Sequence, residues 1–100
     1  MNDKIYKALS DPTRRRILEL LRDRDLNAGE IASNFEIAKP TLSGHFAVLK
    51  AANLIHADKK GTTITYSLNL SVLEESILAL MNAFKIFPRE NSKTKQNYET

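Results

Sequence analysis

The sequence predicts a mainly α protein that carries one two-stranded β-hairpin. Several stretches place apolar residues three and four positions apart, as one face of a helix requires, and one stretch alternates polar and apolar residues, as a strand does. A chain of 100 residues is the length of a single domain, and with no cysteine it has no disulfide and no thiolate metal site. We place the domain at residues 1–87. Residues 88–100 hold almost nothing that could be buried, so we expect a disordered polar tail.

The first two helices follow from apolar spacing and from a strong start signal. A short first helix puts three apolar residues on one face: Ile5, Ala8 and Leu9. The segment 10–25, SDPTRRRILELLRDRD, starts the second helix, with Asp11 as the cap and Pro12 at the first helical position. Arg14 falls on the buried face of this helix. We expect its aliphatic stem to pack there, with a structural ion pair at its end.

Two more helices, joined by a short turn, come next. Asn27 and Glu30 have the spacing of a capping box and start a helix from about Ala28 to Asn34. A second helix runs from Pro40 to Ala52, and Asn53 after it suits the left-handed conformation that ends many helices. The buried face of this second helix consists of Leu42, Phe46 and Leu49. Its opposite face is a stripe of small residues: Gly44, Ala47 and Ala51.

The hairpin and the last helix complete the predicted fold. Residues 54–68, LIHADKKGTTITYSL, alternate like two strands with Lys60-Gly61 at the turn, and we expect their apolar face to lie on the helices. Ser71 is the expected N-cap of the last helix. The apolar residues of that helix cover an arc of about 200°, whereas a one-sided surface helix needs only about 100°. The surplus indicates a second partner for this helix.

A helix-turn-helix followed by a hairpin is a winged helix, and its second helix has the width to enter the major groove of DNA. The net charge of +3 is compatible with such a ligand. Small residues on the outer stripe would let the backbone approach the base edges. We predict base contacts from Lys39, Thr41, Ser43, Gly44 and His45. We predict contacts to the DNA backbone, including those of the wing, from Lys50, Lys59, Lys60, Gly61 and Thr62.

Other interpretations of the same residues stay open at this stage. His45 could be a boundary histidine that bonds locally, Arg14 could contact DNA, and the lysines of the hairpin tip could simply protect a strand edge. The small stripe could instead pack against a helix of another protein, which would make the domain a protein–protein interaction module. The sequence contains two separated histidines and no cysteine, and it offers no nucleophile–base pair, so we do not expect an enzyme.

Three segments carry a family resemblance: ALSDPTRRRILELL, AGEIASNFEIAKPTLSGHFAVLKAANLI and KKGTTITYSL. Together they resemble the ArsR/SmtB family of winged-helix repressors and, among its branches, the SdpR-like autorepressors. The resemblance implies a homodimeric repressor that binds double-stranded DNA and joins its protomers through the first and last helices. The two-fold symmetry of such a dimer predicts a roughly palindromic operator. The residues expected at that dimer interface are Ile5, Leu9, Leu73, Ile77, Leu80, Met81 and Phe84. The resemblance also implies autoregulation and sequestration by a membrane-bound partner protein.

The metal sites of the family have no counterpart in this sequence. Sensors of the family that carry cysteines on the third helix have ligands where this chain has LNAGEIAS, and others use histidine on the last helix, where SVLEESILALMNAF has none. We therefore expect no metal and no cofactor. No apolar run approaches the length that spans a bilayer, and the first residues lack the apolar block of a signal peptide, so we expect a cytoplasmic protein.

Overall fold

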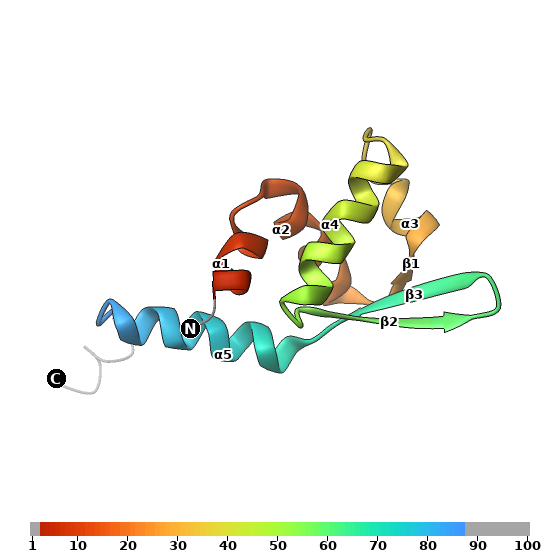
Figure 1. The fold of residues 1–100 in the computed structure, drawn as a ribbon. Helices are drawn as coiled ribbons and strands as arrows, with labels where there is room; N and C mark the ends of the chain where they lie inside the picture. The colour runs from red at the N-terminus through yellow and green to blue at the C-terminus, as the bar shows by residue number, and fades with distance from the viewer. Residues whose placement is uncertain (1–2, 88–100) are drawn as a thin grey trace, which may run out of the picture.

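The computed structural model describes residues 3–87, which form five helices and a three-stranded sheet (Figure 1). The helices are α1 (Asp3–Leu9), α2 (Pro12–Asp23), α3 (Ala28–Ala32), α4 (Lys39–Ala51) and α5 (Leu70–Ala83). The strands are β1 (Leu26–Asn27), β2 (Ile55–Lys60) and β3 (Thr63–Leu68). The mainly α fold with a hairpin is therefore confirmed. The expected disorder of residues 88–100 lies outside the described residues.

The core lies where α1, α2, α3 and α4 meet the base of the sheet. The side chains that are almost completely enclosed there are Ile17, Ile31, Leu49 and Leu54. Each of the helices α1 to α4 contributes the apolar positions that its spacing predicts, because those positions share one helix face. Figure 1 shows α4 between α1 and α3, with the hairpin extending to one side and α5 to the other.

Two helix starts have the caps that the sequence predicts. The carboxylate of Asp11 accepts a hydrogen bond of 3.1 Å from the backbone N–H of Arg14 at the start of α2. At the start of α3, the Asn27 side chain accepts from the Glu30 backbone N–H at 2.8 Å, and the Glu30 carboxylate accepts from the Asn27 backbone N–H at 2.9 Å. These bonds satisfy backbone N–H groups that have no partner inside the helix. They fix the orientation of both helices relative to the chain before them.

The sheet has one strand more than the predicted two-stranded hairpin. β1 pairs antiparallel with β3, with Leu26 opposite Tyr66 and Asn27 opposite Thr65, so the strand order is β1-β3-β2. A strand of two residues is too short to show an alternating pattern, which explains why the sequence does not reveal it. Its effect is to join the start of α3 to the central strand of the sheet.

The hairpin also packs less on the helices than expected. Within β2 only Ile55 is buried, and Ala57, which the alternation places on the apolar face, is exposed. Within β3 only Tyr66 is buried. The turn lies one residue later than predicted, at Gly61 and Thr62, since Lys60 is still paired with Thr63. The hairpin therefore stands away from the core over most of its length, as a wing.

α3 is shorter than the predicted helix from Ala28 to Asn34. The backbone N–H of Asn34 bonds to the carbonyl of Ile31, and that of Phe35 to the carbonyl of Ala32, which tightens the chain into a turn. The side chains of Ser33 and Asn34 also donate to the Glu30 carbonyl, at 2.7 and 3.0 Å. Side chains that bond back to the last carbonyls compete with the continuation of a helix. The helix ends at Ala32 for this reason.

The start of α5 was predicted at the wrong residue. The N-cap is Asn69 and not Ser71, whose hydroxyl donates to the Asn69 side chain at 3.2 Å. The Asn69 amide donates to the carbonyl of Asn53 at 3.0 Å, so it holds α5 to the end of α4. Asn53 itself has φ of 60°, as the predicted left-handed helix stop requires.

α5 has no buried residue within the protomer, unlike the other four helices. Val72 and Leu73 in its first turn are partly buried against the core, whereas Leu78 and Phe84 are 56% and 69% exposed. This confirms the prediction that the apolar surface of the last helix exceeds what its own domain covers. Among residues 3–87, no helix is long and apolar enough to cross a membrane.

Candidate nucleic-acid interface

The apolar face of α4 attaches this helix firmly to the sheet. Leu42, Phe46 and Leu49 are buried, and the Phe46 ring stacks on Tyr66 of β3 with 4.4 Å between ring centroids. Burial raises the pKa of the Tyr66 hydroxyl. Because an aromatic stack fixes both distance and orientation, the position of α4 relative to the hairpin is set by this contact.

The opposite face of α4 is open to solvent and has no carboxylate. The helix sequence, KPTLSGHFAVLKA, contains no acidic residue at all. The exposed residues of this outer face are Lys39, Thr41, Ser43, Gly44, Ala47, Lys50 and Ala51. A Cβ atom built on Gly44 would meet nothing within 4 Å. The domain itself therefore does not need a glycine at this position, although glycine costs helix stability.

His45 differs from the other predicted base-contact residues because it is mostly covered. Its side chain is 15% exposed, and its Nδ1 lies 3.1 Å from Nη1 of Arg14 and 3.9 Å from Oδ2 of Asp11. The ring therefore sits against the turn between α1 and α2. This geometry agrees with the alternative interpretation of His45 as a boundary histidine that bonds locally. Only the exposed part of the ring can contact an external ligand.

Arg14 makes a different set of contacts from the ion pair that the sequence predicts. Its Nε donates to the carbonyl of Ala8 at 2.9 Å, and its Nη2 donates to the carbonyl of Lys7 at 2.7 Å. These are carbonyls of the last turn of α1, where helix geometry leaves acceptors without partners and favours a cation. The expected ion pair is thus replaced by backbone acceptors and His45. The aliphatic stem is partly buried, as predicted.

Asp11 completes this cluster at the N-terminus of α2. The hydrogen bond from the Arg14 backbone N–H is the main cause that holds the pKa of the Asp11 carboxyl below its ordinary value. Partial burial of the carboxyl acts in the opposite direction, and the charge of the Arg14 guanidinium lowers the pKa further. An ionised carboxylate therefore lies beside the covered edge of His45.

The wing brings together the predicted residues of the hairpin tip. Lys59, Lys60 and Thr62 are exposed, and Gly61 has φ of +63°, the left-handed backbone that favours glycine at the first position of a tight hairpin turn. Nζ of Lys60 lies 3.9 Å from Oδ2 of Asp58. Both side chains are largely exposed, so this pair is weak and leaves Lys60 able to exchange its partner.

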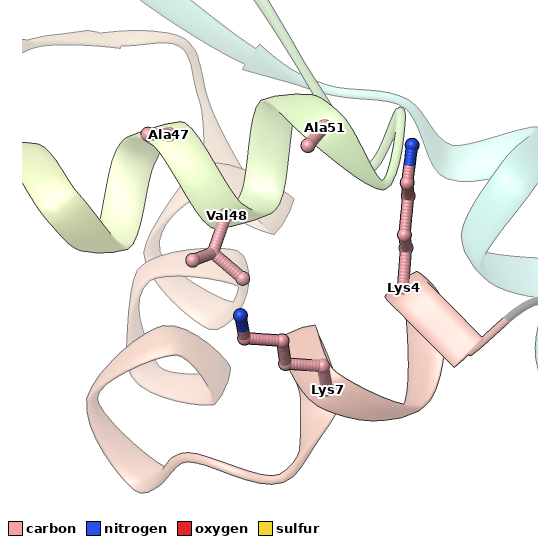
Figure 2. Close-up of a pocket in the computed structure, with 5 residues that line it drawn as sticks. All are labelled: Lys4, Lys7, Ala47, Val48 and Ala51. Atoms are coloured by element: carbon pink, nitrogen blue, oxygen red, sulfur yellow. The ribbon is translucent and has the colours of Figure 1, made fainter.

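Two lysines that the sequence does not single out lie beside the outer face of α4. Lys4 and Lys7 of α1 line a hollow of about 260 Å³ together with Ala47, Val48 and Ala51. Figure 2 shows both lysine side chains rising from α1 on the side that faces α4. Their spacing of three residues on a short helix is the one sequence signal that could have grouped them.

The residues predicted at the dimer interface differ in their exposure within the protomer. Ile5 is buried in the core of its own protomer, so it has little surface left for contact with a second copy. The other predicted residues are partly or largely exposed: Leu9, Leu73, Ile77, Leu80, Met81 and Phe84. The family resemblance places the first helix at the dimer interface, and in this structure α1 packs against α4 and α2.

Comparisons with known proteins agree on one family. Residues 11–57 match the family described as bacterial regulatory protein, arsR family. The transcriptional repressor SdpR of Bacillus subtilis is 49% identical over 80 residues, which are 80% of this chain and 89% of that protein. The arsenical resistance operon repressor of Staphylococcus xylosus is 39% identical over 70% of this chain and 67% of that repressor. An ArsR-like transcriptional regulator from Rhodococcus superposes with a TM-score of 0.72 at 26% identity, over 83% of this chain and 78% of that one.

Proposed function

The chain belongs to the ArsR family of DNA-binding transcription regulators, and we propose that it is a homodimeric repressor of a palindromic operator. The family and the relatives are transcription regulators and not enzymes. The observation that carries the proposal is the outer face of α4, which is exposed and free of carboxylates beside a cationic wing. Such a face suits the major groove because negative phosphates line both sides of the groove.

We assign direct contacts with the bases to the N-terminal half of α4. Lys39, Thr41 and Ser43 carry exposed donors or acceptors, and Gly44 leaves space for a base edge. His45 contributes through the exposed part of its ring. The phosphate contacts fall to Lys50 and to the wing residues Lys59, Lys60, Gly61 and Thr62, which position the protein without selecting a sequence.

The dimer follows from the apolar surface that α5 leaves uncovered. Ile77 and Phe84 are 43% and 69% exposed, and large exposed apolar groups that follow one another on a helix mark an interaction surface. A second copy of the chain would cover them with the same residues, as a two-fold interface requires. Two α4 helices related by this symmetry would meet half-sites about one helical turn apart, or a multiple of it.

Regulation is proposed in three parts. We propose a cytoplasmic protein that represses its own promoter, as the resemblance to SdpR-like autorepressors implies. We propose that no metal is sensed, because the chain has no cysteine and because within residues 3–87 no three potential metal ligands lie together. Sequestration by a membrane-bound partner depends on the family resemblance alone, and none of residues 3–87 is assigned to it.

The division between base and phosphate contacts gives the first prediction. Ser43→Ala should weaken binding to the operator more than binding to unrelated DNA, because only the operator offers the matching base edge. Lys60→Gln should weaken both and lower the slope of log affinity against log salt by about one. Fluorescence anisotropy at several salt concentrations measures these quantities, with Lys85→Gln as a control at an exposed lysine that is not assigned to DNA. Equal losses on both DNAs for Ser43→Ala and Lys60→Gln would contradict the division.

Gly44 gives a prediction in which stability and binding change in opposite directions. Gly44→Ala should raise the free energy of unfolding by up to about 1 kcal/mol, because alanine favours the helix and its Cβ has open space in the protomer. The same methyl group should weaken operator binding, because it occupies the space of a base edge. Urea unfolding and anisotropy on the same preparation measure both effects. Operator binding that is unchanged or stronger would show that α4 does not approach DNA closely at this point.

The dimer gives the third prediction. Leu80→Glu should produce monomers and abolish operator binding, because two buried carboxylates would face each other across a two-fold interface. Sedimentation equilibrium measures the mass in solution, and Asn82→Glu adds the same charge at an exposed polar position of the same helix as a control. A stable dimer of the Leu80→Glu variant would refute this interface.

A further inference from the structure

We propose that Arg14 is a positioning residue for DNA recognition: it holds His45 as the neutral tautomer with its proton on Nε2, so that α4 presents one directional donor. The inference rests on the proposed function, since it concerns how His45 takes part in base contact. Which ring nitrogen of His45 carries the proton is a property of the free protein, so it can be tested without DNA.

The tautomer follows from the chemistry of the contact between the two side chains. Nη1 of Arg14 lies 3.1 Å from Nδ1 of His45, which is hydrogen-bond distance. A guanidinium group has only donors, and it stays protonated in proteins. Nδ1 must therefore be the acceptor, and a neutral ring then carries its proton on Nε2.

Arg14 is itself held in place by two other bonds. Nε and Nη2 donate to the carbonyls of Ala8 and Lys7 at 2.9 and 2.7 Å. Three bonds from one planar group leave the guanidinium a single orientation, so the position of Nη1 is fixed relative to α1. Through this contact the end of α1 determines the orientation of a ring on α4.

The hydrogen-bonding groups around His45 explain why Nδ1 acts as an acceptor in this structure. A protonated ring would place an N–H group on Nδ1 against the guanidinium of Arg14, and both would be donors. Oδ2 of Asp11 is the nearest carboxylate oxygen to Nδ1 among residues 3–87, but at 3.9 Å it is beyond hydrogen-bond distance. Asp11 is also engaged by the backbone N–H of Arg14. The arrangement as it stands is satisfied only with an unprotonated Nδ1.

Nε2 of His45 remains available to a ligand. Within residues 3–87, no side-chain nitrogen or oxygen of a covered residue is both buried and without a hydrogen-bond partner. The hydrogen bond that the His45 ring makes within the described part of the chain uses Nδ1, so Nε2 reaches solvent. His45 directly follows Gly44 in α4, among the residues assigned to the bases.

A neutral histidine with a fixed N–H donor recognises DNA differently from a positively charged histidine. An Nε2–H group bonds in one direction to an acceptor such as N7 or O6 of guanine or O4 of thymine, whereas an imidazolium is attracted to any phosphate. By fixing the proton of the ring on Nε2, Arg14 would make His45 a residue that discriminates between bases. Arg14 would then influence sequence preference without touching DNA.

The first arm of the test needs no DNA. Long-range ¹H–¹⁵N NMR spectra of the protein at pH 7.5 distinguish the two tautomers of each histidine. We expect His45 to be the pure Nε2–H form. His56 is exposed, and its ring makes no side-chain hydrogen bond within residues 3–87, so it serves as the reference ring in the same spectrum. A His45 ring that is protonated on Nδ1, or that resembles His56, overturns the inference.

The second arm tests the effect on recognition. A DNA duplex is first selected by the wild-type protein from a random pool. The affinity for this duplex is then divided by the affinity for unrelated DNA. This ratio is measured for wild type, Arg14→Met, Arg14→Lys, His45→Ala and the double variant Arg14→Met/His45→Ala. Arg14→Met should lower the ratio of the two affinities about tenfold, in the range of a lost base contact. Arg14→Lys should restore part of it, and Arg14→Met should change nothing further when His45 is already alanine.

Three outcomes contradict the inference in distinguishable ways. If Arg14→Met lowers the ratio equally with and without His45, Arg14 acts by another route and the inference alone fails. An unchanged ratio in Arg14→Met likewise overturns it. A pool from which the folded wild type enriches no sequence contradicts the proposed function, and this inference falls with it. The NMR arm on the wild type decides the tautomer even if a variant does not fold.

Discussion

The packing of the apolar face of α4 into the core, where Phe46 stacks on Tyr66 of β3, is the contact on which the rest of the structure depends. Phe46 and Tyr66 stack at 4.4 Å, and with them the apolar residues of four helices close over the sheet. Because this contact joins the helix and the hairpin, it determines where the outer face of α4 lies relative to the wing. The polar and cationic residues that we assign to DNA are then carried on a rigid frame, as a precise contact requires.

The helices differ in how much of their apolar surface the protomer buries, and this difference connects the stability of the domain to its dimerisation. α1 to α4 each contribute buried residues, whereas α5 contributes only partly covered ones in its first turn. A chain of 100 residues has little apolar surface to leave in water without loss of stability. In the proposed dimer α5 is covered by the second copy, so that folding, assembly and the spacing of the two α4 helices depend on the same residues.

Sequence patterns predict the parts of this structure that follow from local rules. The caps at Asp11 and Asn27, the left-handed Asn53 and the apolar faces of the helices each depend on neighbours within a few positions, and the structure confirms them. β1 was missed because its two residues owe their pairing to Tyr66 and Thr65, about forty positions away. The partners of Arg14 and the neighbourhood of Lys4 and Lys7 were missed for the same reason, since packing between helices and not spacing along the chain creates them.

The most direct test of the central claim, that the carboxylate-free face of α4 and the wing form a DNA-binding surface, is a binding titration at two salt concentrations. Purified protein is added to the DNA upstream of its own coding sequence and to an unrelated duplex of equal length, at about 50 and about 200 mM salt. We expect tighter, saturable binding to the upstream DNA and a loss of about a thousandfold or more in affinity across this range, as six or more phosphate contacts produce. Affinity that is equal for both duplexes and insensitive to salt would contradict it, because an interface without phosphate contacts behaves in that way.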